Sequence, residues 1–121
     1  MLTDNTIATA LISAKNRGVD VQLILDPSSV ESSFGKGKLL KQNRIEIFVF
    51  SPPHKKKKKS SYYSALMHNK FAIIDNRLWT GSFNWTKSAN NKNQENVIIL
   101  EDPAMCDKFL AQFQVMKNRC T

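Results

Sequence analysis

The chain has 121 residues, 41% of them hydrophobic and 23% charged, and its 18 Lys and Arg against 10 Asp and Glu give a net charge of +8. This length predicts a single domain over residues 1–121 with the composition of a globular protein. No apolar run approaches the roughly 20 residues of a membrane helix, so we expect no stable membrane insertion.

Alternating helical and β-branched segments organise the chain. Helices are expected in three segments: 4–17 (ended by Gly18), 29–42 (interrupted by two glycines), and from Asp102-Pro103 onward. Strands are expected in five segments: 19–25, 45–50, near 66–74, 78–83 and 95–100. This order predicts an α/β fold with a mixed β-sheet flanked by helices.

The closing helix carries one apolar stripe, interpreted as core. Its members are Cys106, Phe109, Leu110, Phe113 and Met116. A helix between Cys106 and Cys120 would hold the two sulfurs about 21 Å apart, so no intrachain disulfide is expected.

Positive charge is concentrated in one connection, the basic loop 51–65. Residues 51–70 hold six Lys and no acid, whereas the segments on either side each carry +1. A local field of this kind predicts docking of a polyanion, and a solvated lysine loop without a ligand is the alternative. Tyrosines in the loop offer stacking faces for unpaired bases, or else pack within it. The expected nucleic-acid-binding residues are Lys55, Lys56, Lys57, Lys58, Lys59, Tyr62 and Tyr63.

Four polar residues downstream form two pairs with strand spacing. His68 and Lys70 are two apart, as are Ser82 and Asn84, so each pair shares one face of its strand. If the two strands pair with these faces aligned, an imidazole, an ammonium, a hydroxyl and an amide converge. Such a set suits a phosphodiester, because it supplies a nucleophile or acid and several donors for phosphate oxygens.

The ordered pattern of His68-x-Lys70, four residues, Asp75 and then Gly81-Ser82-x-Asn84 resembles the signature of the phospholipase D superfamily. Residues 14–21, 81–87 and 93–96 also resemble the small bacterial endonucleases of that superfamily that carry a single motif. The resemblance runs from about residue 3 to the end and is absent over 51–62.

The resemblance implies a role for each motif residue. His68 would attack phosphorus and form a phosphohistidine, while His68 of the partner subunit would protonate the leaving oxygen. Glu95 would orient the imidazole, Asp75 would organise the strand end, and the remaining residues would hold phosphate oxygens. The implied catalytic set is His68, Lys70, Ser82, Asn84, Glu95 and Asp75. A single motif supplies one histidine, so a homodimer is implied. No cofactor or metal is expected, since no Cys and His cluster has ligand spacing.

Two departures from the family pattern bear on these roles. Five residues separate Asp75 from Gly81, where family members usually have six. With a two-residue turn, Ser82 and Asn84 would face away from Lys70, and only a three-residue turn over 75–77 or a bulge would restore alignment. The chain also lacks the family's N-terminal strand-helix-strand, which predicts a half-domain with an exposed sheet edge.

Three functions are therefore weighed. The leading one is a metal-independent, sequence-nonspecific endonuclease on DNA or RNA. The alternatives are a phospholipase D-type hydrolase of an anionic phospholipid such as cardiolipin, and a catalytically inactive nucleic-acid-binding remnant. Met1 to Asp4 show no signal peptide, so a soluble protein is expected, or a periplasmic or secreted one if an N-terminal segment is missing.

Overall fold

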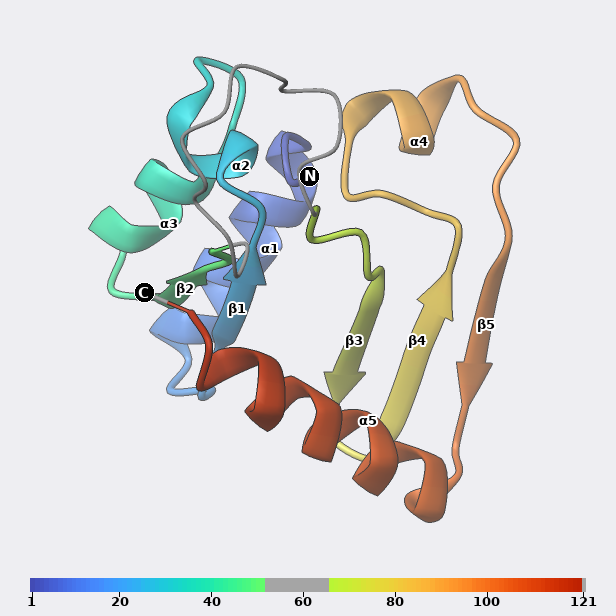
Figure 1. Cartoon of the computed structure of the whole chain (residues 1–121). Coiled ribbons are helices and arrows are strands. Elements are labelled where there is room, and N and C mark those ends of the chain that lie inside the picture. Colours follow the sequence, from blue (N-terminus) through green and yellow to red (C-terminus); the bar gives the residue numbers. More distant parts are fainter. Residues whose placement is uncertain (52–65, 121) are drawn as a thin grey trace, which may run out of the picture.

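The computed structural model describes residues 1–51 and 66–120 (Figure 1). The predictions made for Lys55 to Lys59, Tyr62 and Tyr63 lie outside these residues. Within the described ranges, no helix is both long enough and apolar enough to cross a membrane.

The first half of the chain is a small α/β unit. Its elements are α1 (Asn5–Asn16), β1 (Gln22–Leu25), α2 (Ser28–Glu31), α3 (Gly37–Gln42) and β2 (Glu46–Val49). The Asp4 side chain caps α1 by accepting a hydrogen bond from the amide of Ile7 at 2.9 Å. Gly18, at a φ of 90°, ends the helix as predicted. β1 and β2 pair in parallel, with Leu23 beside Ile47.

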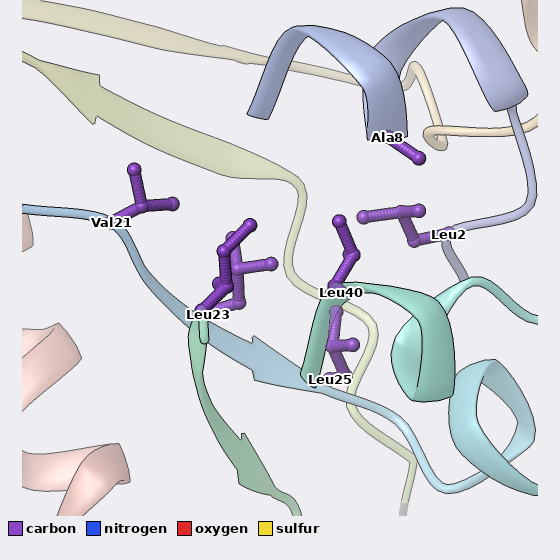
Figure 2. Close-up of a cluster of buried hydrophobic side chains, with 7 residues drawn as sticks. Leu2, Ala8, Val21, Leu23, Leu25 and Leu40 are labelled. Atoms are coloured by element: carbon purple, nitrogen blue, oxygen red, sulfur yellow. The ribbon is translucent and has the colours of Figure 1, made fainter. Parts of the chain in front are cut away.

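The hydrophobic core lies in this first half (Figure 2). It joins the N-terminal segment, α1, β1 and α3, and its buried members are Leu2, Ala8, Val21, Leu23, Leu25, Leu40 and Ile45. Alternate residues of β1 point into it, because side chains two apart on a strand share a face. The core therefore anchors β1, and the backbone of the residue after Leu25 is held in place by this anchor.

The second half is an antiparallel sheet with one long helix. Its elements are β3 (Phe71–Ile74), β4 (Arg77–Gly81), α4 (Lys87–Asn91), β5 (Val97–Leu100) and α5 (Pro103–Lys117). The strand order is β3-β4-β5, and α5 packs against β3 and β4 (Figure 1). Asp102 caps α5 and Pro103 opens it, as predicted. Phe71 meets Phe109 edge to face at 5.0 Å, which fixes the side of the sheet that α5 covers.

The predicted α/β fold is confirmed, but its strands form two sheets where one mixed sheet was expected. One parallel bridge, Leu2 with Trp85, joins the two halves, and the amides of Thr3 and Asp4 both donate to the Trp85 carbonyl oxygen. β5 is an edge strand of the three-stranded sheet, and its residues Val97, Ile98 and Ile99 are exposed.

Local details depart from the sequence predictions. The helix expected over 29–42 is two short helices, with Gly35 in the gap between them and Gly37 at the start of α3. The helix α4 was not expected at all. Of the α5 stripe, only Cys106 is buried, and Leu110 is 47% exposed, so the interpretation of the whole stripe as core was wrong. Among the strands, α5 packs mainly against β3 and β4, and this packing leaves Leu110 exposed. Both cysteines are free.

Candidate active site

His68 and Lys70 lie in the extended segment that leads into β3, and their side chains meet. The Lys70 ammonium donates to Nδ1 of His68 at 3.1 Å and to the His68 carbonyl oxygen at 2.7 Å. The intervening residue faces the other way, since Asn69 Nδ2 donates to the sulfur of Met116 on α5 at 3.2 Å. His68 and Lys70 thus lie on the same side of the chain, as predicted, although β3 begins only at Phe71.

The contact with Lys70 decides which nitrogen of His68 carries the proton. A lysine ammonium only donates, so Nδ1 must accept, and neutral His68 then carries its proton on Nε2. In this arrangement Nε2 is a hydrogen-bond donor. Attack on phosphorus through Nε2 would require the ammonium to leave Nδ1 and the proton to move there.

Ser82 and Glu95 form a second hydrogen-bonded set, between β4 and the start of β5. The Ser82 hydroxyl donates to the Glu95 carboxylate and accepts the amide of Asn96 at 3.0 Å. Asn93 donates to the other Glu95 oxygen at 3.3 Å. Glu95 was expected to orient the His68 imidazole, but its hydrogen-bond partners among the described residues are Ser82 and Asn93. Its role toward an imidazole stays a prediction.

Gly81 allows this set to form. A Cβ built on Gly81 would lie 2.0 Å from the carbonyl oxygen of Asn96, so any side chain would push β5 away from β4. The close approach brings the Asn96 amide to the Ser82 hydroxyl.

The β3–β4 hairpin turns over two residues, Asp75 and Asn76, and its register is regular from Ile74 with Arg77 to Phe71 with Thr80. The three-residue turn considered from the sequence is therefore absent. By strict alternation Ser82 would face away from Lys70. However, Ser82 lies just past the end of β4, and its hydroxyl points toward the backbone of Asn96 and not away from one face of the sheet. Strand alternation stops predicting its direction at that point.

Asn84 lies between two aromatic residues that anchor its loop. Phe83 and Trp85 both meet Trp79 edge to face, at centroid distances of 5.7 and 6.1 Å. Trp79 pairs with Ala72, which places it on the side of the sheet away from α5. Among the described residues Asn84 has no hydrogen-bond partner, so no hydrogen bond joins it to His68 or Lys70 there.

Asp75 occupies the far end of β3 from His68. It is the first turn residue, with a positive φ of 54°, which Asp tolerates better than most residues. This position agrees with a role in shaping the hairpin.

Asp26 was missed by the sequence reasoning, yet it contacts the motif segment. It directly follows β1, and its Oδ2 accepts the amide of Met67 at 3.3 Å while its Oδ1 accepts the amide of Ser28 at 3.0 Å. Partial burial, the largest single influence, would raise the pKa of Asp26. Hydrogen bonds from the Ser28 side chain and from the amides of Ser28 and Met67, together with attraction to the Met1 amino group, outweigh burial and hold the pKa below its ordinary value. An acid at the carboxyl end of a buried strand was the available signal, because such ends commonly border sites.

No group of three His, Cys, Asp or Glu side chains suited to hold a metal ion gathers within residues 1–51 and 66–120. The candidate site thus consists of two clusters, His68 with Lys70 and Ser82 with Glu95, at the entrance to β3 and the exit of β4.

The fold and the two polar clusters are those of a known class of protein, which comparison of the sequence with protein families identifies. Residues 1–117 match the family model described as "Cardiolipin synthase, PLD-like domain". The chain belongs to this phospholipase D-like family.

The similar proteins are named as two different enzymes. A protein named phospholipase D from Rickettsia bellii is 36% identical over 119 residues, which is 98% of this chain and 54% of the relative. A mitochondrial cardiolipin hydrolase from Chlamydomonas reinhardtii is 34% identical over 113 residues, 93% of this chain and 46% of the relative. The chain therefore spans about half the length of these curated relatives.

Among solved structures, Nuc from Salmonella typhimurium, a phospholipase D family member, superposes on this chain with a TM-score of 0.81 at 31% sequence identity. The match covers 99% of this chain and 74% of that one.

Proposed function

We propose that this chain carries half of a phosphodiesterase site and, as a homodimer, cleaves the backbone of nucleic acids without a metal ion. The observation that carries the proposal is the contact of His68 with Lys70, which sets a nucleophilic nitrogen beside a fixed positive charge. Lys70 would supply charge to the phosphate oxygens, as metal ions do in other phosphodiesterases.

The proposed reaction has two displacements at phosphorus. Phosphate oxygens draw the Lys70 ammonium away from Nδ1, so that the His68 proton moves there and Nε2 presents its lone pair. Nε2 attacks phosphorus, the phosphorus bond to the leaving oxygen breaks, and His68 of the partner subunit gives that oxygen a proton. Water then attacks the phosphohistidine, loses its proton to the partner subunit's His68 and releases His68.

Ser82 and Asn84 would bind the other phosphate oxygens. The Ser82 hydroxyl donates to Glu95 here, so binding a phosphate oxygen requires its proton to rotate away from that carboxylate. Asn84 has an amide without a partner among the described residues, at the end of a loop anchored by Trp79. These donors come from one subunit and the second histidine from the other, so the site would be shared across a two-fold axis.

Nucleic acid is favoured as substrate by the net charge of +8 and the run Lys55 to Lys59. A second candidate, hydrolysis of an anionic phospholipid, is supported by relatives named phospholipase D and mitochondrial cardiolipin hydrolase. Lipid surfaces favour basic and apolar residues together, whereas the five lysines have no apolar residue among them. We therefore rank nucleic acid first.

The test is incubation of the purified chain with plasmid DNA, RNA and labelled cardiolipin in excess chelator. We expect strand cleavage that persists in chelator and disappears in His68→Ala. The matched control is His54→Ala, which removes the chain's other histidine and should leave cleavage intact. Cardiolipin turnover without strand cleavage would select the second candidate. Turnover of none of the three, by a chain proven dimeric, would indicate a binding remnant.

A further inference from the structure

We propose that Asp26 is a positioning residue for His68: its carboxylate holds the Met67 amide and thereby fixes where the imidazole is presented. The expected effect on catalysis rests on the proposed function. The contact itself does not depend on it.

Beyond His68 the segment is held by the Asn69 side chain, which donates to the Met116 sulfur, and by the Thr80 hydroxyl, which donates to the Lys70 carbonyl oxygen. The backbone up to His68 has less support. Among the described residues, two hydrogen bonds reach the backbone of 66–69: Asp26 accepts the Met67 amide, and Lys70 donates to the His68 carbonyl oxygen. The second bond lies within the segment itself and ties it to nothing outside. Ladder pairing of β3 with β4 begins at Phe71. The Asp26 bond is therefore the backbone's one described hydrogen-bonded link to the rest of the fold just before the histidine.

Asp26 is itself well placed to act as a fixed point. It follows Leu25, which is 7% exposed and belongs to the core, so its backbone is anchored by β1. Its carbonyl oxygen accepts the amide of Ser29 at 2.9 Å, and its Oδ1 accepts the amide of Ser28 at 3.0 Å. The carboxylate is thus held on one side by α2 and offers its other oxygen to Met67. The path into β3 runs beside the end of β1 and the N-terminus (Figure 1).

The chemistry requires a carboxylate at this position. Both oxygens of Asp26 accept a backbone amide, and an ionised carboxylate accepts on both. An asparagine has one acceptor oxygen, so its amino group would face one of the two N–H donors. The bond to Ser28 is local, whereas the bond to Met67 spans 41 residues and is the longer of the two. We expect Asp26→Asn to keep the Ser28 bond and release Met67.

A catalytic histidine that is misplaced slightly loses rate in the chemical step more than affinity. Asp26→Asn should therefore lower kcat roughly 10- to 100-fold and change KM less than about twofold. The substrate should be a small chromogenic phosphodiester, bis(4-nitrophenyl) phosphate, because it reports the chemical step without relying on docking of a polymer. The matched control is Asp20→Asn, which removes an exposed carboxylate whose described partner is the Gln22 side chain. Asp20→Asn should retain wild-type kcat.

A second measurement does not require activity. In the wild-type chain the Met67 amide should exchange with solvent about tenfold more slowly than the amides of Leu66 and Asn69, after correction for intrinsic rates. In Asp26→Asn this protection should vanish and the NMR signals of Met67 and His68 should move, while Asp20→Asn leaves them in place.

The outcomes separate the two claims. If the wild-type chain cleaves the phosphodiester and Asp26→Asn matches it in kcat, the positioning role is overturned and the proposed function stands. If the wild-type chain cleaves nothing, the proposed function is overturned, and the exchange data alone decide the Asp26 contact. If Asp26→Asn does not fold, an unprotected Met67 amide in the wild-type chain still refutes the inference, and a protected one supports it.

Discussion

The Lys70 ammonium lies 3.1 Å from Nδ1 of His68 and 2.7 Å from the carbonyl oxygen of the same residue. One cation thus holds both the ring and the backbone of the candidate nucleophile. In neutral His68 this contact leaves the imidazole proton on Nε2. Under the proposed mechanism, binding of a phosphate would draw the ammonium away, so Lys70 would link substrate binding to preparation of the nucleophile.

Replacing Lys70 with Met tests this link. The variant keeps most of the side-chain length but loses the charge that binds phosphate oxygens, so we expect kcat for a phosphodiester to fall roughly 100-fold or more. Steady-state kinetics in chelator give the measurement. The control is Lys41→Met on α3, which removes the same charge from an exposed position and should stay within about twofold of wild type. Equal rates for the two variants would show that Lys70 takes no part in catalysis.

Gly81→Ala tests the close approach of β4 and β5. The new Cβ would lie 2.0 Å from the Asn96 carbonyl oxygen, so the strands must part and the Asn96 amide must leave the Ser82 hydroxyl. We expect a loss of about 1–3 kcal/mol in the free energy of unfolding, measured in urea, together with loss of cleavage.

Gly18→Ala is the matched control for Gly81→Ala. Gly18 has a φ of 90° but open space around its Cβ position, so alanine there costs stability through backbone strain and touches nothing in the site. A Gly81→Ala chain with full activity would mean that the Ser82 and Glu95 cluster is not needed for cleavage.

Replacing Lys55 to Lys59 with Ser tests the docking of a polyanion. On duplex DNA, each phosphate that a lysine neutralises contributes about −0.9 to the slope of log affinity against log salt, so up to about four units should disappear. Fluorescence anisotropy at several salt concentrations measures the slope, on a His68→Ala background that cannot cleave the probe. An unchanged slope would show that the five lysines form a solvated loop without a ligand.

Mixing wild-type and His68→Ala chains tests the shared site. With free exchange at equal amounts, about half the dimers are mixed and about a quarter are fully wild type, by the statistics of symmetric pairing. Since a mixed dimer holds one functional histidine, activity per wild-type chain should fall to about half. Exchange is checked with two fluorescent labels. Undiminished activity per wild-type chain, with exchange proven, would mean that one histidine suffices.

Several features of the fold followed from local sequence alone. The stop at Gly18 and the Asp102-Pro103 start of α5 are set by interactions within a few residues, and the structure has both. The pairing of His68 with Lys70 is equally local, because residues two apart in an extended chain share a side. The motif and the family were likewise readable from residue order.

Other features depended on contacts between distant residues. The direction of the Ser82 side chain is decided by its hydrogen bond with the amide of Asn96, fourteen residues later. Alternation along the strands, counted from the two-residue turn, does not predict it. The exposure of Leu110 depends on how α5 packs against β3 and β4. The bond of Asp26 to Met67 joins residues 41 apart, and although the position of Asp26 after β1 marks it as a candidate, the local sequence does not identify Met67 as its partner. The sequence by itself therefore determined the class of protein and its candidate chemical groups, since these depend on residue type and short spacing. Only the tertiary structure decided which of those groups touch, because long-range pairing brings their backbones together.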